Sequence, residues 1–341
     1  MSLQAIVQAA QPTMRTVYVL IALAGAALLL WQPEMVRDVA FFVVTSIFHV
    51  TPIVIPGVVL TAWIMASGAG GQVAAVFNGK TAWTVLASSV VGALLPVCGV
   101  TVLPLMAGLL AGGVPLAPVM AFWLSSPITG PALLSATVAT LGWSFAIGKM
   151  LAAIGLGIFG GAVTGVFAGR AWNRSPLRTN RLVGSFGEAG GCGSPVPFDP
   201  LIWRDRERVA RFVRSLWSTT RFMLLVLTPA FAAEFLLNAW LQPDALVAYV
   251  GRGSVFAVPL AVIVGAPAYV DGYAALPLTR ALMEHGMSSA AAMAFLVSGG
   301  VVSIWGAMAI FPVLKLKPFL LYLFLAASGS MASGWLFGFL Q

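Results

Sequence analysis

Charged side chains are scarce in this chain: they make up 8% of its 341 residues, whereas 60% of the residues are hydrophobic. A soluble domain carries about 25% charged residues, so this chain lacks the polar side chains that would cover a water-exposed surface. Its apolar stretches are long and continuous, unlike the alternating strands of a membrane barrel. They fit helices of about 20 residues that cross a bilayer, and the sequence predicts an all-α polytopic membrane protein with about 8–11 membrane segments.

Cysteine is scarce as well, with Cys98 in an apolar stretch and Cys192 in a hydrophilic one. Two such residues make no disulfide framework, and the chain has no paired-Cys or His-rich metal cluster. The residues NGKT at 78–81 resemble the end of a phosphate-binding loop, but Ala74 stands where its first glycine belongs. A hydrolase elbow motif is missing too. We therefore expect a protein that is not an enzyme and that has no cofactor and no resident metal.

The net charge of +8 does not point to nucleic acid, because the arginines gather in one hydrophilic stretch, as orientation signals do. We interpret residues 172–214 as a basic cytoplasmic linker with a Gly/Pro-rich centre and a final helical part, 201–214, on the membrane surface. A regulatory or partner role for this linker is the alternative. Residues 1–38 are expected to hold an extra N-terminal span without a signal-peptide cleavage site.

Two stretches of the chain are similar at a constant offset, since residues 104–128 align without a gap with residues 277–301 (277 − 104 = 173). Nine of the 25 aligned positions are identical, against roughly two or three expected by chance in so apolar a composition. The pair Thr51-Pro52 also aligns with Thr228-Pro229, at an offset of 177. An internal repeat of half the chain within membrane segments is typical of secondary transporters. We predict two repeats, residues 39–171 and residues 215–341.

The two repeats are expected to be inverted structural repeats. The positive-inside rule places the linker in the cytoplasm, and an odd number of crossings from 39 to 169 then starts the first repeat outside and the second inside. Residues 100–111 and 273–284 are too short to cross a core about 30 Å thick. Broken or re-entrant helices are therefore predicted, and whether 82–111 and 254–284 cross or re-enter stays open. The N-terminus would be cytoplasmic, in a bacterial inner membrane.

A first candidate site lies at two Pro- and Gly-containing breaks in apolar sequence. A carboxylate within membrane sequence is costly and marks a substrate, ion or proton site by default, so Asp271 is the most informative residue. At the offset of 173 it matches Cys98. An interfacial turn for Asp271 and simple packing for Cys98 are the alternatives. The residues of this candidate site are Pro96, Cys98, Gly99, Pro267, Tyr269, Asp271, Gly272 and Tyr273.

A second candidate site comes from two apolar spans that are interrupted at matching positions. Proline inside a helix removes a hydrogen bond and clashes with the preceding turn, and paired interruptions point to a transporter's binding site. Close helix packing through small residues is the alternative. The residues concerned are Ser125, Ser126, Pro127, Pro131, Ser298, Gly299, Gly300 and Ser303. Glu234 and His49, in spans that match each other, are candidate proton carriers, although Glu234 near the headgroups and a merely hydrogen-bonded His49 are equally compatible with the sequence.

At these residues the chain resembles the predicted permease family that includes the bacterial organoarsenical efflux permeases. The resemblance rests on PVCGV at 96–100, PLMAGLL at 104–110, GVPL at 113–116 and AFWLSSP at 121–127. The family's Cys-x-Cys is reduced here to Cys98, with Val100 in the second position, and the second copy has Asp271 in place of cysteine. The resemblance covers most of residues 39–340 and implies export of a small compound.

These observations favour a secondary-active permease that exports a small solute by alternating access. Proton coupling through Asp271 or Glu234 is a hypothesis that follows from their positions in the sequence. A passive channel for a small solute or ion is the main alternative, and a membrane scaffold or intramembrane enzyme is a third. The expected partners are the solute and the lipid bilayer, and the sequence leaves a homodimer open.

Overall fold

The fold is known from a computed structural model that describes residues 33–69, 81–95, 103–111, 113–179, 198–240, 256–265, 275–302 and 304–341. Within these ranges the regular elements are helices, and strand-like pairing is limited to one isolated bridge between Leu177 and Leu314. The prediction of an all-α membrane protein is confirmed. The inversion of the repeats and the number of membrane segments stay predictions.

The long helices are α3 (Pro33–Ser67), α9 (Trp143–Val166), α12 (Arg206–Trp240) and α18 (Leu316–Leu340). The shorter ones are α5 (Thr81–Leu94), α6 (Leu103–Ala111), α7 (Leu116–Ser125), α8 (Pro131–Leu141), α10 (Ala171–Arg174), η1 (Ile202–Arg204), α14 (Ala257–Gly265), α15 (Ala275–Glu284), α16 (Ser289–Val301) and α17 (Ile304–Ile310).

Two described helices, α9 and α18, are each long and apolar enough to cross a membrane. Helix α3 adds a third span if its two parts, which are bent by 59° between His49 and Val54, count as one. Pro52 and Pro56 lie at or beside this bend, and proline is the usual cause of such a kink because it removes a helical hydrogen bond. The described parts of helices α6 and α15 have 9 and 10 residues, whereas a crossing needs about 20.

The helices repeat along the chain at the offset of 173. Helices α7 and α9 begin at 116 and 143, and helices α16 and α18 begin at 289 and 316, which is 173 positions later in each case. The offset of 177 between the Thr-Pro pairs of α3 and α12 stays a prediction.

The turns after the short helices α6 and α15 repeat in the same way. Gly113 and Gly286, which are 173 apart, have φ angles of 87° and 108°, a region that favours glycine because it has no Cβ. After α6 the Val114 amide donates to the Leu109 carbonyl at 3.0 Å. After α15 the Met287 amide donates to the Leu282 carbonyl at 2.9 Å. Each pair closes the end of its helix.

Two pairs of long helices pack antiparallel, α9 with α18 and α3 with α12. In the pair α9 and α18, Phe145 lies near the start of one helix and Phe337 near the end of the other, and their ring centroids are 4.8 Å apart. In the pair α3 and α12, the Arg208 guanidinium at the start of α12 donates to the Ser67 carbonyl at the end of α3 at 3.0 Å. A half-turn about an axis perpendicular to a helix gives a second copy that runs antiparallel to the first.

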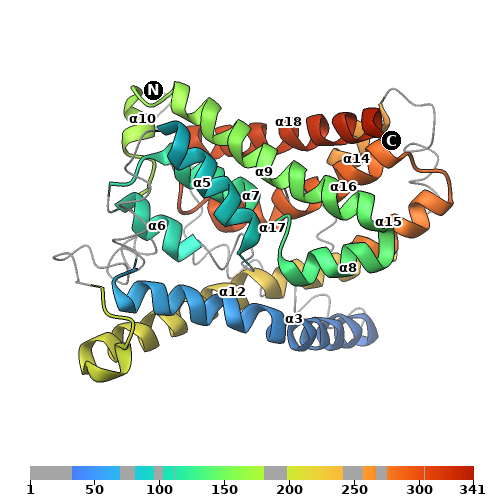
Figure 1. The fold of residues 1–341 in the computed structure, drawn as a ribbon. Coiled ribbons are helices and arrows are strands. Elements are labelled where there is room, and N and C mark those ends of the chain that lie inside the picture. The colour runs from blue at the N-terminus through green and yellow to red at the C-terminus, as the bar shows by residue number, and fades with distance from the viewer. Residues whose placement is uncertain are drawn as a thin grey trace, which may run out of the picture.

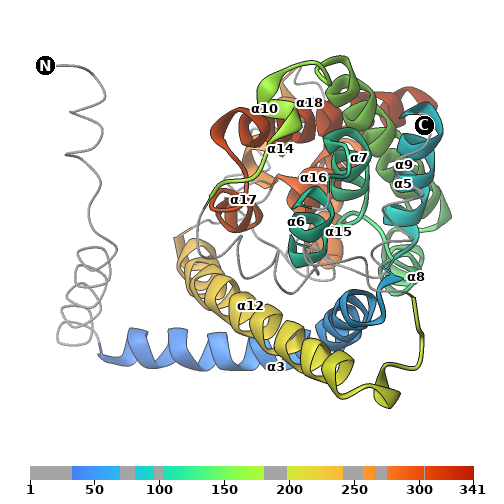
Figure 2. The ribbon, with the colours of Figure 1, turned by 90° about the vertical axis from the view of Figure 1, so that its left-hand side faces the viewer.

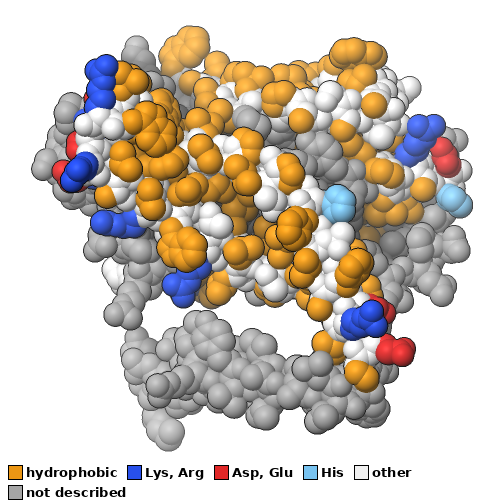
Figure 3. Space-filling model, turned by 90° about the horizontal axis from the view of Figure 1, so that it is seen from below, with side chains coloured by type: hydrophobic (Ala, Val, Ile, Leu, Met, Phe, Trp, Pro, Cys, Tyr) orange, Lys and Arg blue, Asp and Glu red, His pale blue; other side chains and the backbone are white. Residues whose placement is uncertain are grey.

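Helices α3 and α12 form a layer on one side of a bundle that contains α7, α9, α16 and α18 (Figures 1 and 2). All residues of α7 are buried, so this helix lies in the core. On the face that carries the α3 and α12 layer, hydrophobic side chains predominate and charged ones gather toward the margins (Figure 3). Such a surface suits contact with lipid.

The start of the predicted linker is fastened to the turn between α17 and α18. The Lys315 amide donates to the Pro176 carbonyl at 2.8 Å, and the Arg178 amide donates to the Val313 carbonyl at 2.9 Å. Nε of Arg178 also donates to the Leu314 carbonyl at 2.7 Å. The start of the linker is thereby attached to the beginning of the last helix. The last part of the linker, from Arg206, belongs to α12.

Candidate functional site

Two broken helices meet in the middle of the bundle. Helix α7 ends at Ser125 and α8 begins at Pro131, while α16 ends at Val301 and α17 begins at Ile304. A Cβ atom placed on Gly300 would lie 2.9 Å from the Pro127 carbonyl oxygen. The backbones of the two breaks are therefore in contact.

The contacting residues are counterparts of each other, because Pro127 and Gly300 are 173 positions apart (300 − 127 = 173). Leu156 and Gly329 are also 173 apart, and the Leu156 side chain lies against Gly329 where α9 crosses α18. Both contacts join positions that are 173 apart, so the two breaks lie where equivalent residues of the repeated stretches come together.

The first break follows from its prolines. Pro127 has no amide hydrogen for a helical bond, and Pro131 is placed in the first turn of α8, where that missing hydrogen costs nothing. Residues before a proline avoid the helical conformation, and Gly130 is extended, with φ 178° and ψ 153°. The interruption predicted in this span is confirmed.

Ser125 and Ser298 are held in identical packing contacts. Each hydroxyl donates to the carbonyl three residues earlier, Phe122 or Phe295, at 3.1 Å. A Cβ atom on Gly92 would collide with the Ser125 hydroxyl, and one on Gly265 would lie 2.5 Å from the Ser298 hydroxyl. For these two serines the observed contacts are those of close helix packing, which was the alternative left open by the sequence.

Ser126 differs from its neighbour. Its side chain is 1% exposed, and within the described structure its hydroxyl oxygen is buried without a hydrogen-bond partner. A buried hydroxyl normally has a partner, and leaving it without one costs about 1–3 kcal/mol. An unsatisfied hydroxyl inside a helix break is therefore a group available to a ligand or water.

Lys149 is a buried cation that the interpretation of the sequence missed. It lies on the inner face of α9, which is long and apolar enough to span a membrane, and it is 2% exposed. Among the described residues no hydrogen bond or ion pair is found for its ammonium group. The rule that singled out Asp271, a charge within membrane sequence, applies equally to Lys149.

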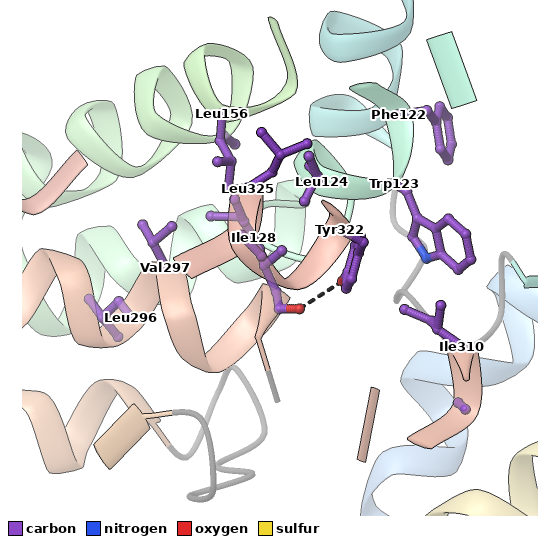
Figure 4. Packing of buried hydrophobic residues seen from close by; sticks show 14 of the residues in the cluster. Phe122, Trp123, Leu124, Ile128, Leu156, Leu296, Val297, Ile310, Tyr322 and Leu325 are labelled. Atoms are coloured by element: carbon purple, nitrogen blue, oxygen red, sulfur yellow. Dashed lines mark hydrogen bonds between the residues drawn. The ribbon is translucent and has the colours of Figure 1, made fainter. Parts of the chain in front are cut away.

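Tyr322 of α18 is the counterpart of Lys149 (322 − 149 = 173). Its buried hydroxyl donates to the Val301 carbonyl at the end of α16 at 2.7 Å, a bond drawn in Figure 4. Its ring also packs against Trp123 of α7, with the ring centroids 5.6 Å apart. Tyr322 of α18 thus contacts the break between α16 and α17.

All residues of the first candidate site lie outside the described residues, namely Pro96, Cys98, Gly99, Pro267, Tyr269, Asp271, Gly272 and Tyr273, and so does Ser303 of the second candidate site. Glu234 belongs to α12, but its side chain is not among those described. His49 is exposed on α3, and its Nδ1 is hydrogen-bonded to the Thr45 carbonyl of the same helix at 2.9 Å. Within the described ranges no three His, Cys, Asp or Glu side chains are grouped as metal ligands would be.

The fold and this centre define an all-helical membrane protein with a repeated arrangement of broken helices. Residues 36–339 match the family described as predicted permease, and the chain belongs to that family. It is also similar to a UPF0718 protein of Methanocaldococcus jannaschii, with 24% identity over 331 residues that cover 82% of this chain and 90% of the relative. No solved structure gives a significant match. The protein is thus a membrane permease.

Proposed function

We propose that the protein is a secondary-active permease that exports a small solute across a bacterial inner membrane by alternating access. The observation that carries this proposal is the contact between Pro127 and Gly300, which joins two broken helices at the junction of equivalent halves. Transporters built from two repeats bind their solutes at such broken helices, where the halves meet. Irregular backbone within a membrane is tolerated where protein or a water-filled cavity surrounds it.

An inverted arrangement of the repeats is part of this proposal. The antiparallel packing of α9 against α18 supports it, because two equivalent spans that run in opposite directions cross the bilayer in opposite senses. Reporter fusions at residue 190 and at the C-terminus test it. We expect residue 190 in the cytoplasm and the C-terminus outside. Reporters on the same side would contradict the inversion.

Proton coupling through Asp271 or Glu234 is the finer part of the proposal. A carboxylate in a poorly solvated site prefers its neutral form and is able to carry a proton as the site alternates. Efflux measured in vesicles with and without a pH gradient tests the coupling, and equal rates would exclude it. A fast flux that does not saturate with solute would indicate a passive channel instead.

The two positions Asp271 and Cys98, which the sequence aligns, are tested by replacement. Asp271→Asn keeps the size and the hydrogen-bonding capacity but not the titration, so we expect transport to be lost while the protein stays folded. Cys98→Ser should have a milder effect. Normal transport by Asp271→Asn together with loss in Cys98→Ser would indicate a thiol-based site. The solute itself is sought by a thermal-shift screen against organoarsenicals, oxyanions, metal ions and amphiphiles, since a bound ligand stabilises the folded state.

A further inference from the structure

The buried lysine on α9 raises the question of what neutralises it. Lys149 is the seventh residue of a 24-residue helix, about 9 Å along the axis from its first residue. A lysine near a helix end usually extends its side chain to the membrane surface. Lys149 does not, since only 2% of its surface is accessible.

The packing on both sides of Lys149 keeps it inside the bundle. A Cβ atom on the preceding residue, Gly148, would collide with the Phe337 ring of α18 and would lie 3.0 Å from Cε of Met293 of α16. One turn further along, Ala153 is completely buried. Helix α9 therefore packs against the second half of the molecule at the level of Lys149.

The register of the repeats aligns Lys149 with Tyr322, whose hydroxyl reaches the second helix break. Helix α9 packs on α7 with Gly161 against Cβ of Ala121, and α18 packs on α16 with Gly334 against Cβ of Ala294. Both members of the second pair are 173 positions beyond those of the first, so the two helix pairs share one register.

In the second half, this register brings the Tyr322 hydroxyl to the carbonyl of Val301. The matching residues in the first half are Lys149 and Ile128, and Ile128 lies within the break between α7 and α8. A lysine side chain reaches about as far as a tyrosine side chain, so the ammonium group is expected at this break. The unpartnered hydroxyl of Ser126 belongs to the same break.

These groups have a common chemical preference. A lysine ammonium supplies three hydrogen-bond donors and a hydroxyl supplies one. Helix α8 begins at Pro131, just after the break, and the start of a helix carries a partial positive charge and free amide donors. A buried charge without a partner is very costly. Among the described residues no carboxylate forms an ion pair with Lys149, and an anionic ligand would supply that negative charge.

We propose that Lys149 and Ser126 form an anion-binding site at the break between α7 and α8, and that the solute carries a carboxylate or a tetrahedral oxyanion group. This inference rests on the proposed permease function and adds the charge of the solute to it. The ammonium group would pair with the anion, and the Ser126 hydroxyl would donate to one of its oxygens. The pairing neutralises the lysine during the passage of the solute.

Equilibrium binding to the full-length protein in lipid nanodiscs tests the proposal. The probes are benzoate and phenylphosphonate, with benzamide as a neutral molecule of similar shape. We expect at least one of the anions to bind and benzamide not to bind. Lys149→Met should weaken binding of the anion by at least about tenfold, because the buried hydrogen bond between the charged ammonium group and the anion is lost. Lys149→Arg should retain most of the affinity, since it keeps the charge.

Lys317→Met is the matched control, because it removes the same charge from an exposed position at the start of α18. It should bind the anion as the unmodified protein does. The proposal is overturned if neither anion binds at millimolar concentration, or if Lys149→Met and Lys317→Met bind equally well. Size-exclusion profiles and helix content show whether each variant is folded. If Lys149→Met does not fold, Ser126→Ala decides the matter, because it removes the proposed hydroxyl donor and unchanged anion affinity would overturn the proposal.

One further variant separates a ligand from an internal counter-charge. If Asp271 neutralised Lys149, the single change Lys149→Met would destabilise the protein and the additional change Asp271→Asn would restore its stability. That restoration would overturn the proposal. Transport of some solute in vesicles without anion binding would refute this inference and leave the permease function intact. Anion binding without transport of any solute in vesicles would support the anion site and refute the permease function.

Discussion

The contact between the two broken helices makes a quantitative prediction at Gly300. A Cβ atom there would lie 2.9 Å from the Pro127 carbonyl oxygen, 3.5 Å from its carbonyl carbon and 3.6 Å from Cα of Ile128. All three atoms belong to the backbone, so no side chain is able to rotate away. Gly300→Ala must therefore move the two breaks apart by a few tenths of an ångström.

The adjacent glycine supplies an internal control. A Cβ atom on Gly299 would meet only the Gly265 carbonyl oxygen, at 3.8 Å, which is an ordinary contact. Both substitutions should gain about 1 kcal/mol from the better helix propensity of alanine. Only Gly300→Ala incurs the cost of overpacking, about 1–3 kcal/mol. We expect Gly300→Ala to be less stable than Gly299→Ala by about 1–3 kcal/mol.

Unfolding of the two variants in the same lipid–detergent mixture measures this difference. Gly299→Ala should unfold at the same temperature as the unmodified protein or at a higher one, and Gly300→Ala at a lower temperature than Gly299→Ala. Equal stabilities of the two variants would refute the close approach of the breaks. A lower stability of Gly299→Ala alone would show that the helix is rotated relative to the contact described here.

Two further predictions concern single contacts. Tyr322→Phe removes the donor to the Val301 carbonyl and should lower the free energy of unfolding by about 1–3 kcal/mol, measured in the same unfolding experiment; an unchanged stability would mean that water replaces the hydroxyl. Arg178→Gln removes the bond to the Leu314 carbonyl and should speed amide hydrogen exchange in the turn before α18, because that turn is then held by fewer bonds. Arg174→Gln, at an exposed position, should leave the exchange unchanged, and equal exchange in both variants would show that Arg178 does not hold the turn.

Several features of the fold could be predicted because their causes are local in the chain. The scarcity of charge predicts a membrane protein, and Pro127, Gly130 and Pro131 predict the break between α7 and α8, since proline and glycine act on their own backbone. The repeat is visible in the residues themselves.

The candidate site was predicted less completely. Ser125 and Ser298 suggest polar site residues, but each packs against a glycine more than thirty positions earlier in the chain, Gly92 or Gly265. Which glycine contacts the serine depends on how two helices cross, and the residues next to the serine in the sequence do not indicate it. The rule that a charge within a membrane segment marks a functional residue applies to Lys149 as it does to Asp271, so its position is visible in the sequence while its burial is not.

The amino-acid sequence by itself determined the class of the protein, its duplication and the places where its helices break, because composition, repeated residues and proline act without reference to distant segments. The tertiary structure decided which residues meet. The contacts of Pro127 with Gly300 and of Leu156 with Gly329 depend on how two halves pack against each other. The burial of Lys149 depends on the same packing, since a helix of this sequence alone would leave the lysine exposed.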